Sequence, residues 1–493
     1  MAFASLGNFI DLLADRGELL RINQPVHTNL EICAVADLEM KKSGGGKALL
    51  FEKPLLADGT ISSFPLLINA YGSRSRMAAS LGVGDVSEVA DKLAFLLKAK
   101  PPKNLKEGWE LLRQGIGVVH ARPGKALTAA CKENIHHADR SGTFHGMDSL
   151  PILKCWPQDG GPFVTLPTVY TQDPDTGERN VGMYRMQVYD GWTTGMHWQL
   201  HKVAARHGRR YFETGQRMPV TVCLGGDPVY AFAATAPLPD GLDEILLAGF
   251  LRQESVPMVK CETNDLMVPA NSDFVLEGYV DPLEPLRMEG PFGDHTGFYT
   301  PRDLFPVFHI TCITHRSGAV YPATIVGKPP MEDLYLGQAS VSIFLPMFKM
   351  NFPEIIDLAL PAEGVFHNLV FVSIKKQYPY HAYKIMNGLW GMGQMMFSKI
   401  IVVVDAHVDV HNTFDVLFHL CSNIDPQRDT TFTKGPCDSL DHATNEPNIG
   451  SHMGIDATSK LAGEGYKREW PKECVMPEEI RRKALTFLAG AKA

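Results

Sequence analysis

Length, composition and charge place the chain among large globular proteins. It has 493 residues, of which 45% are hydrophobic and 21% charged, and its formal net charge is −8. These values predict about three domain-sized units and exclude the basic surface that nucleic-acid binding requires. The nine cysteines are odd in number and form no CxxC pair, which excludes a disulfide framework and a structural zinc site. We expect most cysteines to be core residues in a reducing, cytoplasmic compartment.

The first predicted element is an amphipathic helix within residues 1–16. Apolar residues recur there at helical spacing behind Ser5, a favourable N-cap, at Leu6, Phe9, Ile10 and Leu13. This pattern favours a helix over a signal peptide. No apolar run approaches the ~20 residues of a membrane-spanning helix, so we expect no transmembrane segment, while peripheral membrane contact stays open. The lysine- and proline-rich run 98–103 predicts a loop, and we expect a first α/β segment over residues 1–115.

Strand patterns dominate the middle of the chain. Residues 164–171 and 180–189 enclose a cluster of turn formers, which predicts a β-hairpin. Residues 218–224 and 307–313 are further strands rich in β-branched side chains. Many strands with few helices predict a barrel or sandwich core, which we assign to residues 116–325.

The last third of the chain has the pattern of an α/β domain. Two short apolar runs, 369–374 and 400–404, flank a helical stretch at 381–396. The order strand, helix, strand predicts a βαβ unit with a parallel sheet. Residues 326–493 are therefore expected to form a separate α/β domain that ends in a helix at 477–488. The overall fold class is expected to be α+β or α/β.

The segment 288–297 holds the most informative chemical groups. Glu289 and Asp294 are five positions apart, and the glycines and proline between them exclude a regular helix. A tight loop can aim both carboxylates into one pocket, where paired acids tend to split their pKa values and keep one protonated as a general acid. The alternative is a surface turn in which glycine and aspartate serve geometry alone.

Arg185 lies on a predicted strand of an otherwise apolar domain. A buried lone charge is costly, so Arg185 is expected to pair with Glu289 or Asp294 or to hold a substrate carboxylate. The alternative is an exposed arginine on an edge strand. Asn180 and Arg185 have opposite parity, so a strand that sends both to one site must bulge or twist near Gly182.

Two further groupings could hold a cofactor. His201, Asn180 and Glu244 would give an N/O ligand set that suits Mn²⁺ or Mg²⁺, whereas His197 and His207 are expected to be core or surface histidines. Lys384 near a helix start could receive a phosphate, and an exposed lysine is the alternative. The chain has neither a GxGxxG after a strand nor a P-loop, so the usual nucleotide motifs are absent.

Six collinear segments resemble the UbiD family of decarboxylases. They span residues 180–185, 242–252, 289–299, 374–382, 424–429 and 453–460. The resemblance implies a split-barrel flavin-binding core, a C-terminal oligomerisation domain, and a homodimer or homohexamer. It also implies prenylated FMN, supplied by a separate flavin prenyltransferase, with its phosphate held through Mn²⁺ or Mg²⁺ beside a K⁺ ion.

The resemblance also implies roles for individual residues. The metal ligands would be Asn180, His201 and Glu244, and the catalytic residues would be Arg185, Glu289 and Asp294. The cofactor would contact Asn180, Arg185, His201, Ala234, Thr235 and Lys384. The backbone near Ala233, Ala234 and Ala236, together with Arg428, would lie near the K⁺ ion and the phosphate.

The implied reaction is the reversible, non-oxidative decarboxylation of an aromatic acid of hydroxybenzoate type. Loss of CO2 from an sp² carbon needs a cofactor that accepts the electron density, and Glu289 would then return a proton to that carbon. The whole chain is closest in appearance to the 4-hydroxy-3-polyprenylbenzoate decarboxylases of ubiquinone biosynthesis. Alternatives are a decarboxylase of menaquinone biosynthesis or of aromatic or heteroaromatic acid degradation, a non-catalytic flavin- or metal-binding protein, and a flavin-free hydrolase.

Overall fold

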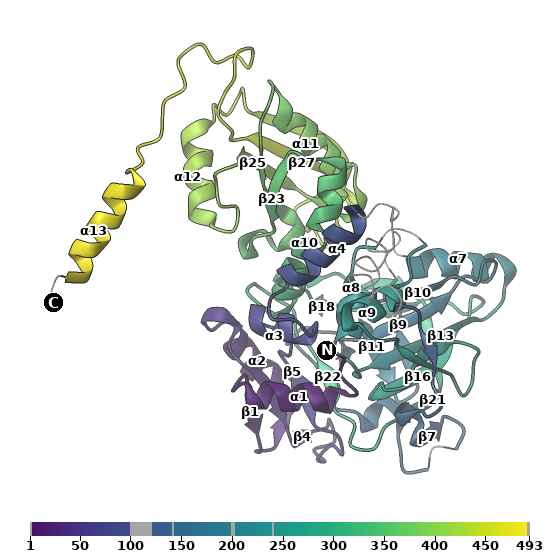
Figure 1. The fold of residues 1–493 in the computed structure, drawn as a ribbon. Helices are drawn as coiled ribbons and strands as arrows, with labels where there is room; N and C mark the ends of the chain where they lie inside the picture. The colour runs from purple at the N-terminus through teal and green to yellow at the C-terminus, as the bar shows by residue number, and fades with distance from the viewer. Residues whose placement is uncertain (1, 99–120, 141, 199–202, 239–240, 491–493) are drawn as a thin grey trace, which may run out of the picture.

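Figure 1 shows the fold of the chain in a computed structural model. The structure describes residues 2–98, 121–140, 142–198, 203–238 and 241–490. Most of the predicted loop at 98–103 and the predicted metal ligand His201 lie outside these residues. The described chain builds three main sheets, one of four, one of nine and one of five strands.

The N-terminal region confirms the predicted first helix. In α1 (Leu6–Asp15) the Ser5 Oγ accepts a hydrogen bond from the Asn8 amide at 3.2 Å, and the four predicted apolar positions are buried. The four-stranded sheet beside α1 has the order β1 (Leu19–Ile22), β3 (Ala48–Phe51), β5 (Leu66–Ile68) and β22 (Tyr321–Ala323). Its last strand comes from far along the chain, so this sheet joins the first segment to the central one. The remaining elements of this region are β2 (Val26–His27), α2 (Glu31–Met40), β4 (Pro54–Leu55), α3 (Arg74–Ser80) and α4 (Ser87–Lys98).

The central region is a curled, half-barrel sheet of nine strands. Its order is β10 (Arg179–Gly182), β9 (Thr168–Gln172), β13 (Met218–Leu224), β16 (Phe274–Val280), β21 (Val307–His315), β12 (Thr193–Gly195), β11 (Met186–Asp190) and β8 (Phe163–Val164), with β7 (Asn134–His137) added on β21. Both strands predicted from β-branched runs, β13 and β21, lie inside this sheet. Alternate β13 side chains such as Val220 and Val222 are fully buried, which fits a strand that faces a core.

Helices cover one end of this sheet near β10. They are α7 (Val203–Thr214), α8 (Val229–Thr235) and α9 (Glu244–Arg252). The helices α8 and α9 pack on each other, and all three contact β10. A small separate sheet joins β6 (Gly124–Lys125), β14 (Pro257–Lys260) and β15 (Met267–Pro269).

The predicted hairpin is correct in its first half and wrong in its second. The strand β10 pairs with β9, but the expected return strand 180–189 stops at Gly182, and β11 then pairs with β8 and β12 instead. A Cβ at Gly182 would lie 2.3 Å from the Tyr184 hydroxyl, so only glycine lets the Tyr184 ring fold back against the strand end. In place of the expected bulge, the strand is interrupted at residues 183–185. The alternation of side chains along a continuous strand therefore does not force Arg185 and Asn180 to opposite faces.

The C-terminal region confirms the predicted βαβ unit. After the long helix α10 (Glu332–Asn351), five strands form the order β23 (Ile355–Ala359), β24 (Leu369–Ile374), β25 (Ile400–Asp405), β27 (Ile449–Asp456) and β26 (Thr430–Pro436). The strands β24, β25 and β27 run parallel, and the edge strands β23 and β26 are antiparallel to their neighbours. The crossover helix α11 (His381–Trp390) is shorter than predicted because a 3₁₀ turn (Gly393–Phe397) follows it. The helix α12 (Thr413–Asn423) completes this region.

The C-terminal helix α13 (Glu478–Gly490) stands apart from the rest of the ribbon at the end of an extended segment (Figure 1). None of its side chains is buried. Within the described residues, the structure contains no helix with the length and apolar character needed to cross a membrane. All nine cysteines are free thiols and seven of them are buried, which confirms the prediction that most are core residues.

Candidate active site

The segment with the two carboxylates folds as two short, adjacent strand pairs. The strand β17 (Arg287–Glu289) pairs with β20 (Asp303–Phe305), and β18 (Phe292–Gly293) pairs with β19 (Tyr299–Thr300). Gly290 connects them with a φ of +90°, a conformation that favours glycine. Glu289 is the last residue of β17, and Asp294 directly follows β18. We refer to residues 288–297 as the acid loop.

Contacts from distant parts of the chain fix the acid loop. The Gly290 amide donates to the Gln187 side-chain oxygen at 2.7 Å, and the Gly293 amide donates to an Asp159 carboxylate oxygen at 2.8 Å. The other Asp159 oxygen accepts from the Trp156 amide. A Cβ at Gly293 would lie 2.2 Å from Trp156 Cδ1, so this position admits no side chain. These supports were not predicted, because Gln187 and Asp159 are brought to the loop only by the tertiary fold.

The structure brings Arg185, Glu289 and Asp294 together in one buried network. Arg185 Nε donates to Glu289 Oε1 at 3.0 Å, and its Nη1 donates to Asp294 Oδ2. The Thr300 hydroxyl accepts from Nη2 at 3.1 Å, and the Phe292 ring lies 4.6 Å from the guanidinium carbon. The side chain of Arg185 is 11% exposed and that of Glu289 is 1% exposed. This burial does not fit the alternatives of a surface turn and an exposed edge arginine.

The expected split between the two carboxyl pKa values does not occur. Burial raises both pKa values, but this effect is outweighed at Glu289 by the His197 hydrogen bond and the Arg185 charge. At Asp294 it is outweighed by His295 and Arg185. Both pKa values therefore lie below their ordinary range, because each acid has a histidine partner of its own and one guanidinium serves both. In this arrangement both groups are carboxylates at neutral pH.

His197 is a site residue that the sequence did not identify. Its Nδ1 lies 3.0 Å from Glu289 Oε1, the same oxygen that Arg185 contacts. Glu289 Oε2 is buried and has no hydrogen-bond partner among the described residues. His197 follows β12, which lies beside β17, and no local pattern signals this proximity. One Glu289 oxygen is thus fixed and the other is available to a bound molecule.

The C-terminal domain covers the outer side of the acid loop. His295 Nδ1 lies 3.0 Å from Asp294 Oδ1; burial lowers the His295 pKa, but the Asp294 hydrogen bond and charge raise it above its ordinary value overall. The His295 ring lies 5.5 Å from that of Phe366 and 5.7 Å from that of His367. The Phe298 ring lies 4.1 Å from that of His442. The loop is therefore enclosed between two domains.

A second group of predicted residues lines a cavity of about 390 Å³ in the central domain. Asn180 and Glu244 both face this cavity, together with Tyr170, Arg179 and His207. Glu244 Oε2 accepts from the Val181 amide at 2.9 Å, and burial raises the Glu244 pKa to about 7. The predicted third ligand, His201, lies outside the described residues. His207 is a buried histidine whose Nδ1 lies 3.1 Å from the Thr171 hydroxyl, as expected for a core residue.

The residues at this cavity fit a divalent cation and a small-molecule cofactor. Glu244 is a partly buried carboxylate with no ion-pair partner of its own among the described residues, because Arg179 is paired with Asp243. The carboxylate of Glu244 and the amide of Asn180 are oxygen donors of the kind that Mn²⁺ and Mg²⁺ prefer. The cavity volume lies within the range typical of small-molecule sites.

Four of the predicted cofactor contacts do not line this cavity: Arg185, which lies in the acid network, and Ala234, Thr235 and Lys384. Ala234 and Thr235 lie at the end of α8, which packs against β10, and the Thr235 hydroxyl donates to the Phe232 carbonyl at 2.8 Å. Lys384 lies in the C-terminal domain on α11, where it forms an ion pair with Glu354. Arg428, expected near the phosphate, pairs with Asp429 in the same domain. The structure therefore does not bring Lys384 or Arg428 to the Asn180–Glu244 cavity.

Comparison with known sequences defines the family of the chain. Three domains described for UbiD, the 3-octaprenyl-4-hydroxybenzoate carboxy-lyase, match in order: the N-terminal domain at residues 10–96, the Rift-related domain at 124–329 and the C-terminal domain at 334–457. An uncharacterized protein of Archaeoglobus fulgidus is 48% identical over 487 residues, which cover 98% of this chain and 97% of that protein. The chain belongs to the UbiD family of carboxy-lyases.

Solved structures agree with this assignment. The closed form of vanillic acid decarboxylase from Sedimentibacter hydroxybenzoicus superposes with a TM-score of 0.85 at 25% identity and full coverage of both chains. Its open form has a TM-score of 0.78. The UbiD-class enzyme HmfF from Pelotomaculum thermopropionicum, solved with FMN, has a TM-score of 0.79 at 25% identity and covers 98% of this chain and 99% of its own. An evolved dimeric form of HmfF was solved with prFMN.

Proposed function

We propose that the protein catalyses the reversible, non-oxidative decarboxylation of an aromatic carboxylic acid with prenylated FMN. The observation that carries this proposal is the buried Arg185–Glu289–Asp294 network, in which one Glu289 oxygen lacks a partner. When bound, prenylated FMN would accept the electron density that departing CO2 leaves on the substrate. The remaining steps are proton transfers and orientation, which the network can supply.

Glu289 is the proposed proton donor to the carbon that loses CO2. Its Oε1 is fixed by Arg185 and His197, so Oε2 is the atom that would carry the proton. The network holds Glu289 ionised, and a substrate carboxylate placed beside it would raise its pKa through like-charge repulsion. Proton uptake by Glu289 would thus accompany substrate binding. Asp294, fixed by His295, would keep Arg185 in place for this exchange.

Asn180, His201 and Glu244 are the proposed residues for a Mn²⁺ ion that binds the cofactor phosphate. Arg185 lies five positions after Asn180, and an extended chain of that length spans at most about 18 Å, so the phosphate site and the acid network are held near each other by one segment. A K⁺ ion is proposed near Ala234 and Thr235, where α8 ends, because carbonyl oxygens are its usual ligands.

The proposed substrate is an acid of hydroxybenzoate type, with a role in ubiquinone biosynthesis. The family description names 3-octaprenyl-4-hydroxybenzoate, which supports a polyprenylated substrate. The similarity to vanillic acid decarboxylase supports the alternative of a smaller phenolic acid and a degradative role. A menaquinone precursor is the third candidate.

The proposed assembly is a homo-oligomer, a dimer or a hexamer, whose cofactor comes from a separate flavin prenyltransferase. The helix α13 supports association, because its large apolar side chains are exposed on a segment that stands apart: Ile480, Leu485, Phe487 and Leu488.

The proposed domains are residues 1–115, 116–325 and 326–493.

Coexpression with a flavin prenyltransferase tests the proposed function. The purified chain should show flavin absorbance, retain manganese, and release CO2 from at least one acid in a panel of hydroxybenzoates, a polyprenylated hydroxybenzoate and a naphthoate. Cofactor uptake without turnover on any acid would support a non-catalytic flavin protein instead. Absence of both flavin and metal would support the flavin-free hydrolase.

A further inference from the structure

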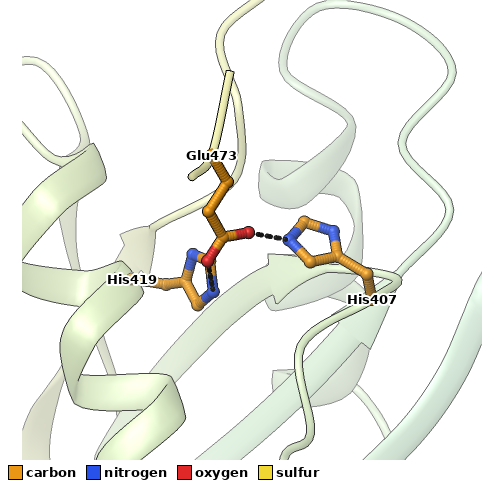
Figure 2. Close-up of side chains that lie close together, drawn as sticks. All are labelled: His407, His419 and Glu473. Atoms are coloured by element: carbon orange, nitrogen blue, oxygen red, sulfur yellow. Dashed lines mark ion pairs between the residues drawn. The ribbon is translucent and has the colours of Figure 1, made fainter. Parts of the chain in front are cut away.

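A second cluster of ligand-type side chains lies far from the acid loop, on the C-terminal domain. Figure 2 shows His407, His419 and Glu473 pointing toward one another from three separate segments. His407 follows β25, His419 lies on α12, and Glu473 belongs to the extended segment before α13. No part of the proposed decarboxylation uses these residues.

The geometry of the cluster fits a metal ion between the three side chains. Glu473 Oε2 lies 3.6 Å from His407 Nε2, and Glu473 Oε1 lies 4.0 Å from His419 Nε2. Ligand atoms about 2.1 Å from a tetrahedral zinc lie about 3.4 Å apart, so both spacings come into range with small side-chain rotations. The three ligand atoms all lie within 4.8 Å of one another, and rotation of the exposed His407 ring can close the remaining gap.

A fourth ligand is available one helical turn before His419. Asp415 Oδ1 lies 3.7 Å from His419 Nε2, which is again too long for a hydrogen bond and suitable for two ligands of one ion. Two imidazoles and two carboxylates form a four-ligand set of the kind that zinc accepts. Among the described residues, no hydrogen bond satisfies the nitrogens of His407 or His419.

The position of Glu473 indicates what such an ion would do. Residues 471–490 are exposed throughout, and the ion pairs that join this segment to the rest of the described chain both end on Glu473. Exposed ion pairs contribute only about 0–1 kcal/mol each, too little to hold an extended segment of this length. His419, by contrast, is only 8% exposed, so its ring is held in place by the α/β domain.

We propose that His407, His419 and Glu473, with Asp415 as the fourth ligand, bind a Zn²⁺ ion that fastens the C-terminal segment to the α/β domain. The imidazole-rich set favours Zn²⁺, whereas the oxygen-rich Asn180–Glu244 site favours Mn²⁺ or Mg²⁺. The ion fixes where the chain leaves the domain and therefore the direction in which α13 projects. This site is independent of the proposed decarboxylation.

Zinc titration of the full-length, chelator-treated protein tests the proposal. The Glu244→Gln background removes the oxygen-rich site, so one tight Zn²⁺ per chain is expected to remain by calorimetry. Adding Glu473→Gln should weaken this binding by more than about tenfold. Glu473 lies in an exposed segment, so its replacement leaves the fold intact. His411→Ala is the matched control, because His411 is an exposed histidine of the same domain that pairs with Asp357.

Tryptic cleavage gives a second readout that does not depend on stoichiometry. Exposed cleavage sites lie just before this segment, at Lys467 and Arg468, and within it, at Lys472. Zn²⁺ should slow cleavage there in the wild type and in His411→Ala, and should have no effect in His419→Ala. Equal zinc affinity with and without Glu473, or cleavage that Zn²⁺ slows equally in all variants, would overturn the proposal.

Discussion

The acid network of the central domain and the histidine cluster of the C-terminal domain gather similar groups in opposite environments. In the buried network, Arg185 and His197 both contact Glu289 at hydrogen-bond distance, and the side chains are almost fully enclosed. In the exposed cluster, the spacings are 3.6 and 4.0 Å, and His407 is 59% exposed. Buried charges must be paired directly, because an unpaired charge is costly there, whereas exposed groups can remain apart in water. At the surface, a spacing too long for a hydrogen bond between ligand-type groups is therefore compatible with a metal ion between them.

The largest effect is expected from Arg185→Met, which removes the charge shared by two buried acids. Loss of one partner from a buried ion pair typically costs about 3–5 kcal/mol, so the denaturation midpoint should fall strongly at pH 8. Glu289 and Asp294 have pKa values lowered by folding, so their stabilisation is present above the unfolded carboxyl pKa and lost as the pH falls. The deficit of the variant should therefore shrink at pH 3, below the unfolded carboxyl pKa of about 4. Arg140→Met, which removes an exposed arginine whose partner Asp139 is also exposed, should leave both midpoints unchanged. A deficit that is equal at both pH values would contradict this explanation.

The next largest effect is expected on the Mn²⁺ affinity of Glu244→Gln. Replacing a charged ligand by a neutral amide should weaken Mn²⁺ binding to the cofactor-free protein by about 100-fold, measured by electron paramagnetic resonance. Glu178→Gln is the control, because Glu178 lines the same cavity but is exposed. Equal losses in both variants would mean that the cavity attracts manganese by general charge and not through Glu244.

A smaller effect is expected from Gly293→Ala in the acid loop. The new Cβ would meet the Trp156 ring at 2.2 Å, so the loop or the ring must move, at a typical cost of about 1–3 kcal/mol. Turnover should fall because the loop positions both acids. Gly124→Ala, whose Cβ would lie 3.8 Å from its neighbour, should have no effect on stability or turnover. Unchanged turnover in Gly293→Ala would show that the loop position is not critical.

The smallest effect is expected from His407→Ala in the absence of zinc. An exposed ion pair contributes about 0–1 kcal/mol, so the thermal midpoint of the metal-free protein should hardly change. A loss comparable to that of Arg185→Met would remove the contrast between the two regions.

Local patterns predicted the elements whose partners are close in sequence. The first helix followed from its N-cap and apolar spacing, and the βαβ unit followed from two apolar runs around a helix. The break at residues 183–185 could not be predicted, because it depends on where β11 finds its partners. The same holds for β22, which completes a sheet formed mainly by residues 19–68.

The identities of the main site residues could be predicted from the sequence, but their contacts and their pKa values could not. The sequence pointed to Arg185, Glu289 and Asp294, and the structure brings them together. It did not point to His197, because the proximity of β12 and β17 is purely tertiary. It also suggested one raised carboxyl pKa, whereas His197 and His295, together with the guanidinium between the acids, lower both carboxyl pKa values. The His407–His419–Glu473 cluster was missed because its members are widely spaced and only the fold assembles them.

The most direct test of the account is the turnover of Glu289→Gln in cofactor-loaded protein. Asp303→Asn serves as the control, because Asp303 pairs with Glu289 across the strand ladder but is exposed. We predict that the flavin spectrum and metal content stay unchanged while CO2 release in Glu289→Gln falls by about 10²–10⁴-fold, the usual contribution of a general acid. Full turnover in Glu289→Gln would contradict the assignment of Glu289 as the proton donor and with it the proposed mechanism.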